Sequence, residues 1–308
     1  MKTVVLFDNL GPYHLARLKS ASSVFELLAI EVAGKSRDYT WSNPEGQPQL
    51  RKETLFVEGT SRSLSLNELK SRLNSILGEF RPEVIFLPGW SGIIAFDAMI
   101  WTLENAVPAV SMSESTEQDM PRKGYKEWIK KRLVGVCSSA LVGGSRQADY
   151  IAKLGMPPDR ISLGYDAVDN DYFCRRAAEV RAREAESRIK HNLPAKYFLA
   201  SARFIEKKNL PRLIQAYAKY RDLAANDSPW ELVLLGDGQL RPILEPQLLT
   251  ANLQNHVRLP SFKQYSELPF YYGCAGAFVH ASTTEQWGLV VNEAMASGLP
   301  VLVSNRCG

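Results

Sequence analysis

Residues 285–300 read EQWGLVVNEAMASGLP, and this stretch carries more information than any other part of the chain. Two carboxylates, Glu285 and Glu293, stand eight positions apart with Gly288 between them. A glycine at this place lets the backbone approach a ligand where a loop enters a helix. We therefore expect Glu285 on the loop and Glu293 in the second turn of the helix, facing different parts of one long ligand. The alternative is two solvated carboxylates around a packing glycine.

Residues 201–210 form a second informative stretch, because they follow an apolar run and open a helical pattern. Arg203 and Lys208 fall in this strand-to-helix loop. A helix N-terminus with two cations beside it favours a diphosphate through backbone N–H groups, the helix dipole and charge-assisted hydrogen bonds. A solvated basic turn is the alternative. Further along, Gly236 and Gly238 make a strand-end GxG turn, which serves either ligand approach or turn geometry.

Short apolar runs alternate with helical patterns on both sides of these stretches, which predicts parallel sheets covered by helices. We expect an α/β unit over residues 1–170, a charged connector over 171–195 and a second α/β unit over 196–308. A parallel sheet normally covers its last strand with a helix, and none follows residues 301–303, so we expect the second unit to be incomplete. The expected strands are residues 4–7, 27–32, 84–87, 109–112, 140–142, 197–201, 232–235, 257–259, 277–280 and 301–303.

Taken in order, these motifs resemble those of the family-4 retaining glycosyltransferases (glycosyl transferases group 1) of the GT-B superfamily. The shared features are an E-x7-E motif, a G-R-x4-K segment in which Ala202 replaces the glycine, and the GxG turn. The resemblance covers most of the chain and is strongest over residues 197–300. It implies two Rossmann-like domains that face each other across a cleft.

The resemblance also implies an activity. It is the transfer of a sugar from a UDP, GDP or ADP sugar to a glycan or lipid-linked acceptor, with retention of configuration and without a metal or other cofactor. Polysaccharide or glycolipid synthesis is the expected setting. Two rivals stay open: a nucleotide-sugar epimerase or phosphorylase of the same fold, and a degenerate sugar-binding scaffold.

Site roles follow from the same resemblance. Glu285 is expected to contact the sugar hydroxyls and Glu293 the ribose, while Arg203 and Lys208 bind the pyrophosphate. Arg203, Lys208 and Glu285 are thus the catalytic candidates. The remaining donor-binding candidates are Gly11, Gly236, Gly238, Gly288 and Leu289.

The first half of the chain matches the family less closely, and Asp166 and Ala167 stand where the family usually has Asn and Gly. Gly11 fits the glycine-containing loop after the first strand, and His14 could reach the same place, although a surface histidine is the alternative. The family commonly has a histidine after a later strand, where this chain has none. Ser113 or Glu114 is expected to face the sugar instead. Asp166–Asp169 is similar to the family's N-G-V-D stretch.

Residues 121–134 combine basic and apolar side chains and include a single acid, Glu127. A basic amphipathic helix that carries Trp can lie on an anionic membrane surface. Membrane contact through Arg122–Arg132 is therefore one expectation. The other is an ordinary surface helix that buries its stripe of Trp128, Ile129 and Leu133 against the sheet.

Bulk composition narrows the remaining classes of function. A net charge of +4 over 308 residues, with no nucleic-acid-binding motif, argues against a nucleic-acid partner. The four cysteines lack metal-ligand spacing and are expected to be free thiols in a reducing compartment. No apolar run reaches the roughly 18 residues that a membrane span needs. A cytoplasmic protein, or one peripheral on the cytoplasmic membrane face, is expected.

Overall fold

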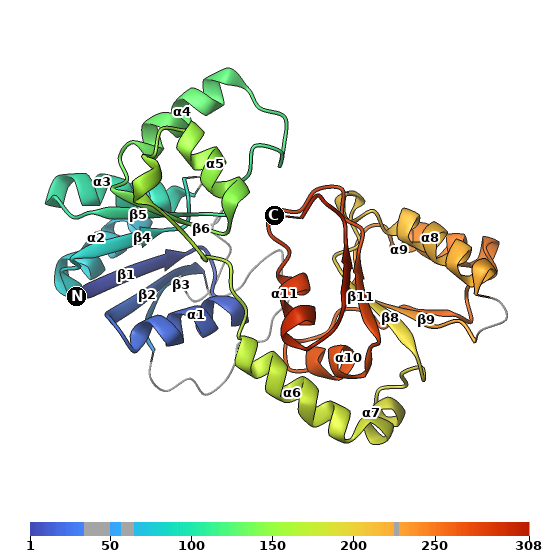
Figure 1. The fold of residues 1–308 in the computed structure, drawn as a ribbon. Helices are drawn as coiled ribbons and strands as arrows, with labels where there is room; N and C mark the ends of the chain where they lie inside the picture. The colour runs from blue at the N-terminus through green and yellow to red at the C-terminus, as the bar shows by residue number, and fades with distance from the viewer. Residues whose placement is uncertain (34–49, 57–64, 91, 225–227, 308) are drawn as a thin grey trace. The chain divides into compact units, whose positions relative to one another are not determined.

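The computed structural model describes residues 1–33, 50–56, 65–90, 92–224 and 228–307. The chain divides into two compact units, Met1–Ala167 and Val168–Cys307, each an α/β layer structure (Figure 1). The two Rossmann-like units that the sequence predicts are therefore present. Residues 171–195, expected to be a separate connector, belong to the second unit. No helix in these described ranges is long and apolar enough to cross a membrane.

The first unit is built on a parallel sheet whose strands, within the described residues, run in the order β3-β2-β1-β4-β5-β6-β7. Its strands are β1 (Lys2–Phe7), β2 (Glu26–Ala33), β3 (Arg51–Phe56), β4 (Val84–Leu87), β5 (Ala109–Ser113), β6 (Ser139–Val142) and β7 (Ile161–Leu163). The two edge strands, β3 and β7, were not predicted. Side chains at an edge are largely exposed, as Arg51 and Leu163 are, so no continuous apolar run marks such a strand.

Helices cover both faces of this sheet. They are α1 (Pro12–Ser22), α2 (Leu66–Phe80), α3 (Ile93–Asn105), α4 (Gly124–Val134) and α5 (Ser145–Lys153). Successive strand residues point to opposite faces. Leu6 of β1 accordingly packs in the core that includes residues of α2 to α5. Its neighbour Phe7 packs with Leu15 and Leu18 of α1. Helices α2 to α5 thus form one layer and α1 lies on the other face.

The second unit has a parallel sheet in the order β10-β9-β8-β11-β12. Its strands are β8 (Tyr197–Ser201), β9 (Glu231–Leu235), β10 (Val257–Arg258), β11 (Ala277–His280) and β12 (Val301–Val303). Its helices are α6 (Asn170–Ala182), α7 (Glu184–Lys190), α8 (Leu210–Leu223), α9 (Arg241–Thr250), α10 (Leu268–Cys274) and α11 (Leu289–Ala296). Every strand predicted for this half is present, because each is a short apolar run between turn signals.

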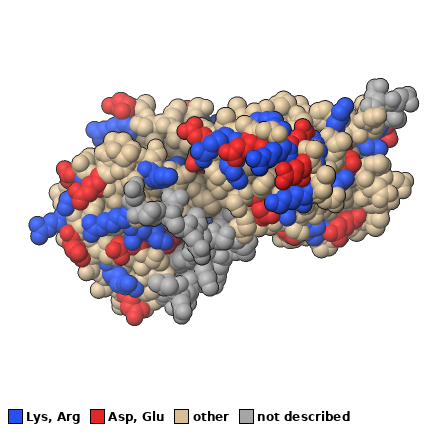
Figure 2. All heavy atoms as spheres, turned by 90° about the horizontal axis from the view of Figure 1, so that it is seen from below, with Lys and Arg blue, Asp and Glu red and all other residues tan. Residues whose placement is uncertain are grey.

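Helices α6 and α7 show why the connector prediction was wrong. Phe173, Ala177 and Val180 form a narrow buried stripe on α6, which packs against α10. The approach is close, since a Cβ on Gly273 of α10 would lie 2.7 Å from Val180 Cγ1. The outer faces carry intermixed positive and negative side chains (Figure 2), including the Arg176–Glu179 pair at 2.6 Å. The charged side chains of α6 and α7 therefore form a solvated outer face, while the inner faces of both helices pack against α10 within the second unit.

Candidate functional site

The second sheet places the candidate residues at its topological switch point. Strands β9 and β10 extend the sheet on one side of β8, and β11 and β12 extend it on the other. In open α/β sheets the loops at the carboxyl ends of the strands diverge at such a point and leave room for a ligand. Arg203 and Lys208 follow β8, and Glu285 follows β11. Strand pairing thus brings together residues that are distant in the sequence.

Lys208 and Glu285 form an ion pair across these two loops. Lys208 Nζ contacts Glu285 Oε2, and the two side chains are only 12% and 10% exposed. Glu285 Oε2 also lies 2.9 Å from His280 Nε2 and 3.2 Å from Ser282 Oγ. Burial would raise the pKa of Glu285, but the hydrogen bond from His280 and the interactions with Lys208 outweigh it and lower that pKa to about 2. Glu285 is therefore an ionised acceptor held from several sides.

Two members of this cluster, His280 and Ser282, were not among the predicted site residues. Both side chains are buried at the carboxyl end of β11. The sequence did contain a signal for them. Polar residues at the carboxyl end of an apolar strand indicate a ligand site when that strand lies beside the topological switch point. Sequence alone could not use that signal, since the strand order was unknown.

Positive charge gathers beside Glu285. Arg203 is exposed on the loop after β8. Burial lowers the pKa of Lys208, Glu285 opposes this effect, and the charges of Lys207 and Arg203 lower the pKa further. The two loops are tied together, because Asn209 Nδ2 donates to Ala281 O at 3.1 Å and Thr283 N donates to Lys207 O at 2.9 Å. The cluster is thus preorganised to bind a ligand that carries an anionic group next to hydroxyl groups, with the cations facing the anion and Glu285 accepting from the hydroxyls.

The glycines of the GxG turn serve turn geometry. Gly236 and Gly238 have φ values of +125° and +147°. A Cβ on Gly236 would lie 1.9 Å from Ala202 O, and one on Gly238 would lie 2.8 Å from Phe204 O. The turn after β9 therefore packs directly on the loop that carries Arg203, and both glycines are required by the protein's own backbone.

Gly288, Leu289 and Glu293 belong to α11. Gly288 precedes the helix with φ +102°, a conformation that favours glycine, and Leu289 is the first helical residue. Glu293 lies in the second turn and Glu285 on the preceding loop, as expected. Glu293, however, is fully buried, and its Oε2 accepts a 2.6 Å hydrogen bond from Tyr272 OH. Its contact with a ribose stays a prediction.

Comparison with known proteins relates the second part of the chain to a family. Residues 182–308 match the model of the family described as glycosyl transferases group 1. An alpha-monoglucosyldiacylglycerol synthase of Acholeplasma laidlawii is 29% identical over 102 residues, which is 33% of this chain and 25% of the relative. The sulfoquinovosyl transferase SQD2 of Arabidopsis thaliana is 26% identical over 261 residues, or 78% and 46% of the two chains. These matches thus span between a quarter and a half of the relatives' lengths.

Solved structures support the fold. Anabaena Alr3699/HepE, in complex with UDP and glucose, superimposes with a TM-score of 0.72 at 17% identity. The match covers 100% of this chain and 82% of that one. A glycosyltransferase from Rickettsia africae gives a TM-score of 0.73 at 15% identity, with 100% and 80% coverage. The two-unit α/β fold of the GT-B class, which the motifs imply, is therefore confirmed.

Beyond the group 1 domain, the first unit places Gly11 and His14 together at the start of α1. Gly11 N donates to His14 Nδ1 at 3.0 Å, and the imidazole ring packs 4.4 Å from the ring of Phe7. Burial, and to a lesser degree the charge of Arg17, lower the pKa of His14 to about 3. His14 is therefore neutral, and it caps the helix as part of the packed β1–α1 turn.

Glu114 lies beside Asp166, the first residue of the D-A-V-D stretch. Asp166 is buried, with Arg17 Nη1 at 3.4 Å from its Oδ1. Burial is the main factor that raises the pKa of Asp166 to about 8, and the charge of Glu114 adds to it against that of Arg17. Ser113 is buried and its Oγ accepts from Ser115 N at 3.2 Å. Glu114 is less buried than Ser113.

The pKa of Asp166 leads to a prediction about stability. Above pH 3.8 the unfolded chain loses the proton that the native Asp166 retains, so native stability falls as pH rises from about 4 to about 8. Relative to wild type, Asp166→Asn should thus gain roughly 3–4 kcal/mol between pH 5 and pH 8. Urea unfolding at both pH values measures this gain. The exposed Asp222→Asn variant is the control, and a pH-independent difference for Asp166→Asn would contradict the prediction.

Two further predictions concerned metals and cysteines. Within the described ranges, no group of three or more His, Cys, Asp or Glu side chains is arranged to hold a metal ion. The cysteines, Cys137, Cys174, Cys274 and Cys307, are free.

Proposed function

We propose that this chain is a retaining glycosyltransferase that moves a sugar from a nucleotide diphosphate sugar to a glycan or lipid-linked acceptor, without a metal cofactor. One observation carries the proposal: Lys208 and the ionised Glu285 meet beside Arg203 at the switch point of the second sheet. A diphosphate needs cations, and a sugar needs a hydrogen-bond acceptor for its hydroxyls. This cluster supplies both, because the cation Lys208 and the acceptor Glu285 are in direct contact.

Each residue has a distinct role in the proposed reaction. Arg203 and Lys208 bind the diphosphate and stabilise the negative charge that grows on it as the bond to the sugar breaks. Such preorganised charges contribute a large part of many rate enhancements. Glu285 accepts hydrogen bonds from the sugar hydroxyls and orients the donor. His280 and Ser282 hold Glu285 in place from the buried side.

The relatives support the class of acceptor. Two of them are named for the synthesis of monoglucosyldiacylglycerol and for sulfoquinovosyl transfer, and an O-antigen chain mannosyltransferase of Salmonella typhimurium is 26% identical over 185 residues. These names favour glycolipid or cell-surface polysaccharide synthesis. Free cysteines favour the cytoplasm as the place of reaction. The UDP bound in the Anabaena structure makes UDP the first nucleotide to test.

Nucleotide binding tests the donor site. The protein is titrated with UDP, GDP and ADP separately, and thermal unfolding is measured. The nucleotide that matches the donor should stabilise the wild type by about 2.7 kcal/mol at 100 times its dissociation constant. Lys208→Met should abolish the response. Lys219→Met, which removes an exposed lysine from the same unit, should retain it. Absence of a response to all three nucleotides in the wild type would contradict the proposal.

Turnover then separates the proposal from its rivals. A transferase consumes the nucleotide sugar only when an acceptor is present, and its product keeps the donor's anomeric configuration by NMR. An epimerase converts the donor alone, and a phosphorylase requires phosphate. A scaffold binds without turnover.

A further inference from the structure

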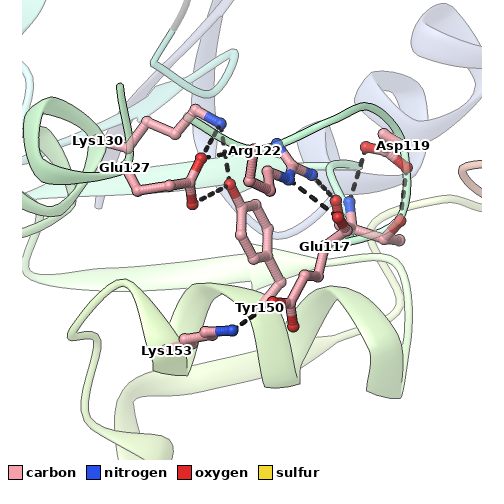
Figure 3. A network of polar contacts seen from close by, with 8 residues as sticks. Glu117, Asp119, Arg122, Glu127, Lys130, Tyr150 and Lys153 are labelled. Carbon is pink, nitrogen blue, oxygen red and sulfur yellow. Dashed lines mark hydrogen bonds and ion pairs between the residues drawn. The ribbon is translucent and has the colours of Figure 1, made fainter. Parts of the chain in front are cut away.

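Helix α4 of the first unit is held by polar contacts on its inner side. Glu127 accepts hydrogen bonds from Lys130 Nζ at 2.9 Å and from Tyr150 OH at 2.8 Å, and Lys130 Nζ also donates to Tyr150 OH at 2.9 Å (Figure 3). Tyr150 belongs to α5 and is buried. Because this buried hydroxyl needs hydrogen-bond partners, it draws the polar side chains of α4 inward.

The segment before α4 is anchored to the same network. Arg122 Nε donates to Glu117 O at 2.9 Å, Nη1 lies 3.9 Å from Glu127 Oε1, and the guanidinium group stacks 4.4 Å from the Tyr150 ring. Lys153 of α5 pairs with Glu117, as Figure 3 shows. Two of the six basic residues in this segment, Arg122 and Lys130, thus neutralise Glu127 and fix the rotation of the helix.

The outer side of α4 is apolar and basic. Tyr125, Trp128 and Ile129 are 61%, 59% and 47% exposed. The expected burial of the stripe is therefore wrong for Trp128 and Ile129, and it holds only at the end of the helix, where Leu133 packs against the core and Val134 enters it. The four remaining basic residues are exposed around these apolar side chains: Lys123, Lys126, Lys131 and Arg132. The one acid of α4 is turned inward, so the positive charge of this face is uncompensated within the helix.

Helix α3 adds apolar surface to the same layer. Ile93, Phe96 and Leu103 are each more than half exposed, at spacings that place them along one side of the helix. The opposite side of α3 packs in the core that also holds Val134 of α4. Both helices thus present large apolar side chains outward from one face of the first sheet.

We propose that the outer face of α4, with α3 beside it in the layer, binds an anionic lipid bilayer. Aromatic side chains with a polar edge and aliphatic side chains favour the interfacial region of a membrane, where Tyr and Trp are enriched. Exposed lysine and arginine side chains are attracted to anionic lipid headgroups. This inference goes beyond the proposed function, since it rests on the exposure and charge of the first unit alone.

Vesicle co-sedimentation tests the proposal. Wild-type protein should bind vesicles of phosphatidylcholine with phosphatidylglycerol and bind pure phosphatidylcholine vesicles at least tenfold more weakly. The double variant Trp128→Ser/Ile129→Ser and the double variant Lys126→Glu/Lys131→Glu should each lose at least tenfold in affinity for the anionic vesicles. Leu223→Ser, which removes an exposed leucine from the second unit, is the matched control and should bind as wild type does.

Several outcomes would overturn the proposal. One is anionic-vesicle binding that the α4 variants leave unchanged, and another is no binding to either vesicle. A third is a dimer, seen by size-exclusion chromatography, that the Trp128→Ser/Ile129→Ser variant dissociates while vesicle binding is absent. All substituted residues are exposed, and circular dichroism confirms that the variants fold. The assay contains no nucleotide sugar, so its result is independent of the proposed transferase activity.

Discussion

Replacing Gly236 with alanine is expected to lower the free energy of unfolding of the second unit by about 4 kcal/mol or more. The new Cβ would lie 1.9 Å from the backbone oxygen of Ala202, and φ at this residue is +125°. A strained φ costs about 1–3 kcal/mol, and overpacking adds about 1–3 kcal/mol. Relief would require a shift of the loop that carries Arg203. Nucleotide binding by any folded fraction should weaken for the same reason.

Urea unfolding of the variant measures this loss, and Gly78→Ala is its control. Gly78 lies inside α2, and an added Cβ there would meet nothing within 4 Å. Alanine in a helix interior is favoured over glycine by about 0.5–1 kcal/mol, so Gly78→Ala should be more stable than wild type. If the free energy of unfolding of Gly236→Ala lies within about 1 kcal/mol of the wild-type value, the two loops do not pack as closely as described.

Glu285→Gln is expected to destabilise the protein by on the order of 3 kcal/mol at pH 7. The native pKa of Glu285 is about 2, below the ordinary value of 4.5, and each unit of difference corresponds to about 1.4 kcal/mol. Because this native pKa is lowered, the contribution is fully present above pH 4.5 and is lost as pH falls toward 2. Urea unfolding at pH 7, 4 and 2.5 should show the difference from wild type shrinking. A difference that stays constant with pH would contradict this expectation.

A double-mutant cycle assigns that energy to the ion pair. The single variants Lys208→Met and Glu285→Gln, combined, should show a coupling of about 1–3 kcal/mol, as contacting buried groups do. The exposed pair Arg176–Glu179 is the matched control and should couple by less than about 0.5 kcal/mol. Equal coupling in the two cycles would mean that solvent screens Lys208 and Glu285 as fully as the surface pair.

The sequence by itself determined the architecture and the order of the site motifs. Buried parallel strands are short apolar runs, and the residues after them form the loops. Among the described residues, periodicity therefore located the strands except β3 and β7, the exposed edges of the first sheet. It placed Arg203 and Lys208 after one strand and Glu285 after another. The resemblance of these motifs pointed to the glycosyl transferases group 1, and residues 182–308 match the model of that family.

Only the tertiary structure decided which of these residues meet and which side chains are buried. Strands β8 and β11 are distant in the chain, and their hydrogen bonding brings Lys208 and Glu285 together and adds His280 to the cluster. Helix α4 is the clearest case of a local pattern that fails. Its Trp128 has the spacing of a core residue, yet the buried hydroxyl of Tyr150 takes Glu127 and Lys130 as partners and turns Trp128 outward. Such a choice depends on a partner in another helix, and no local pattern of residues records it.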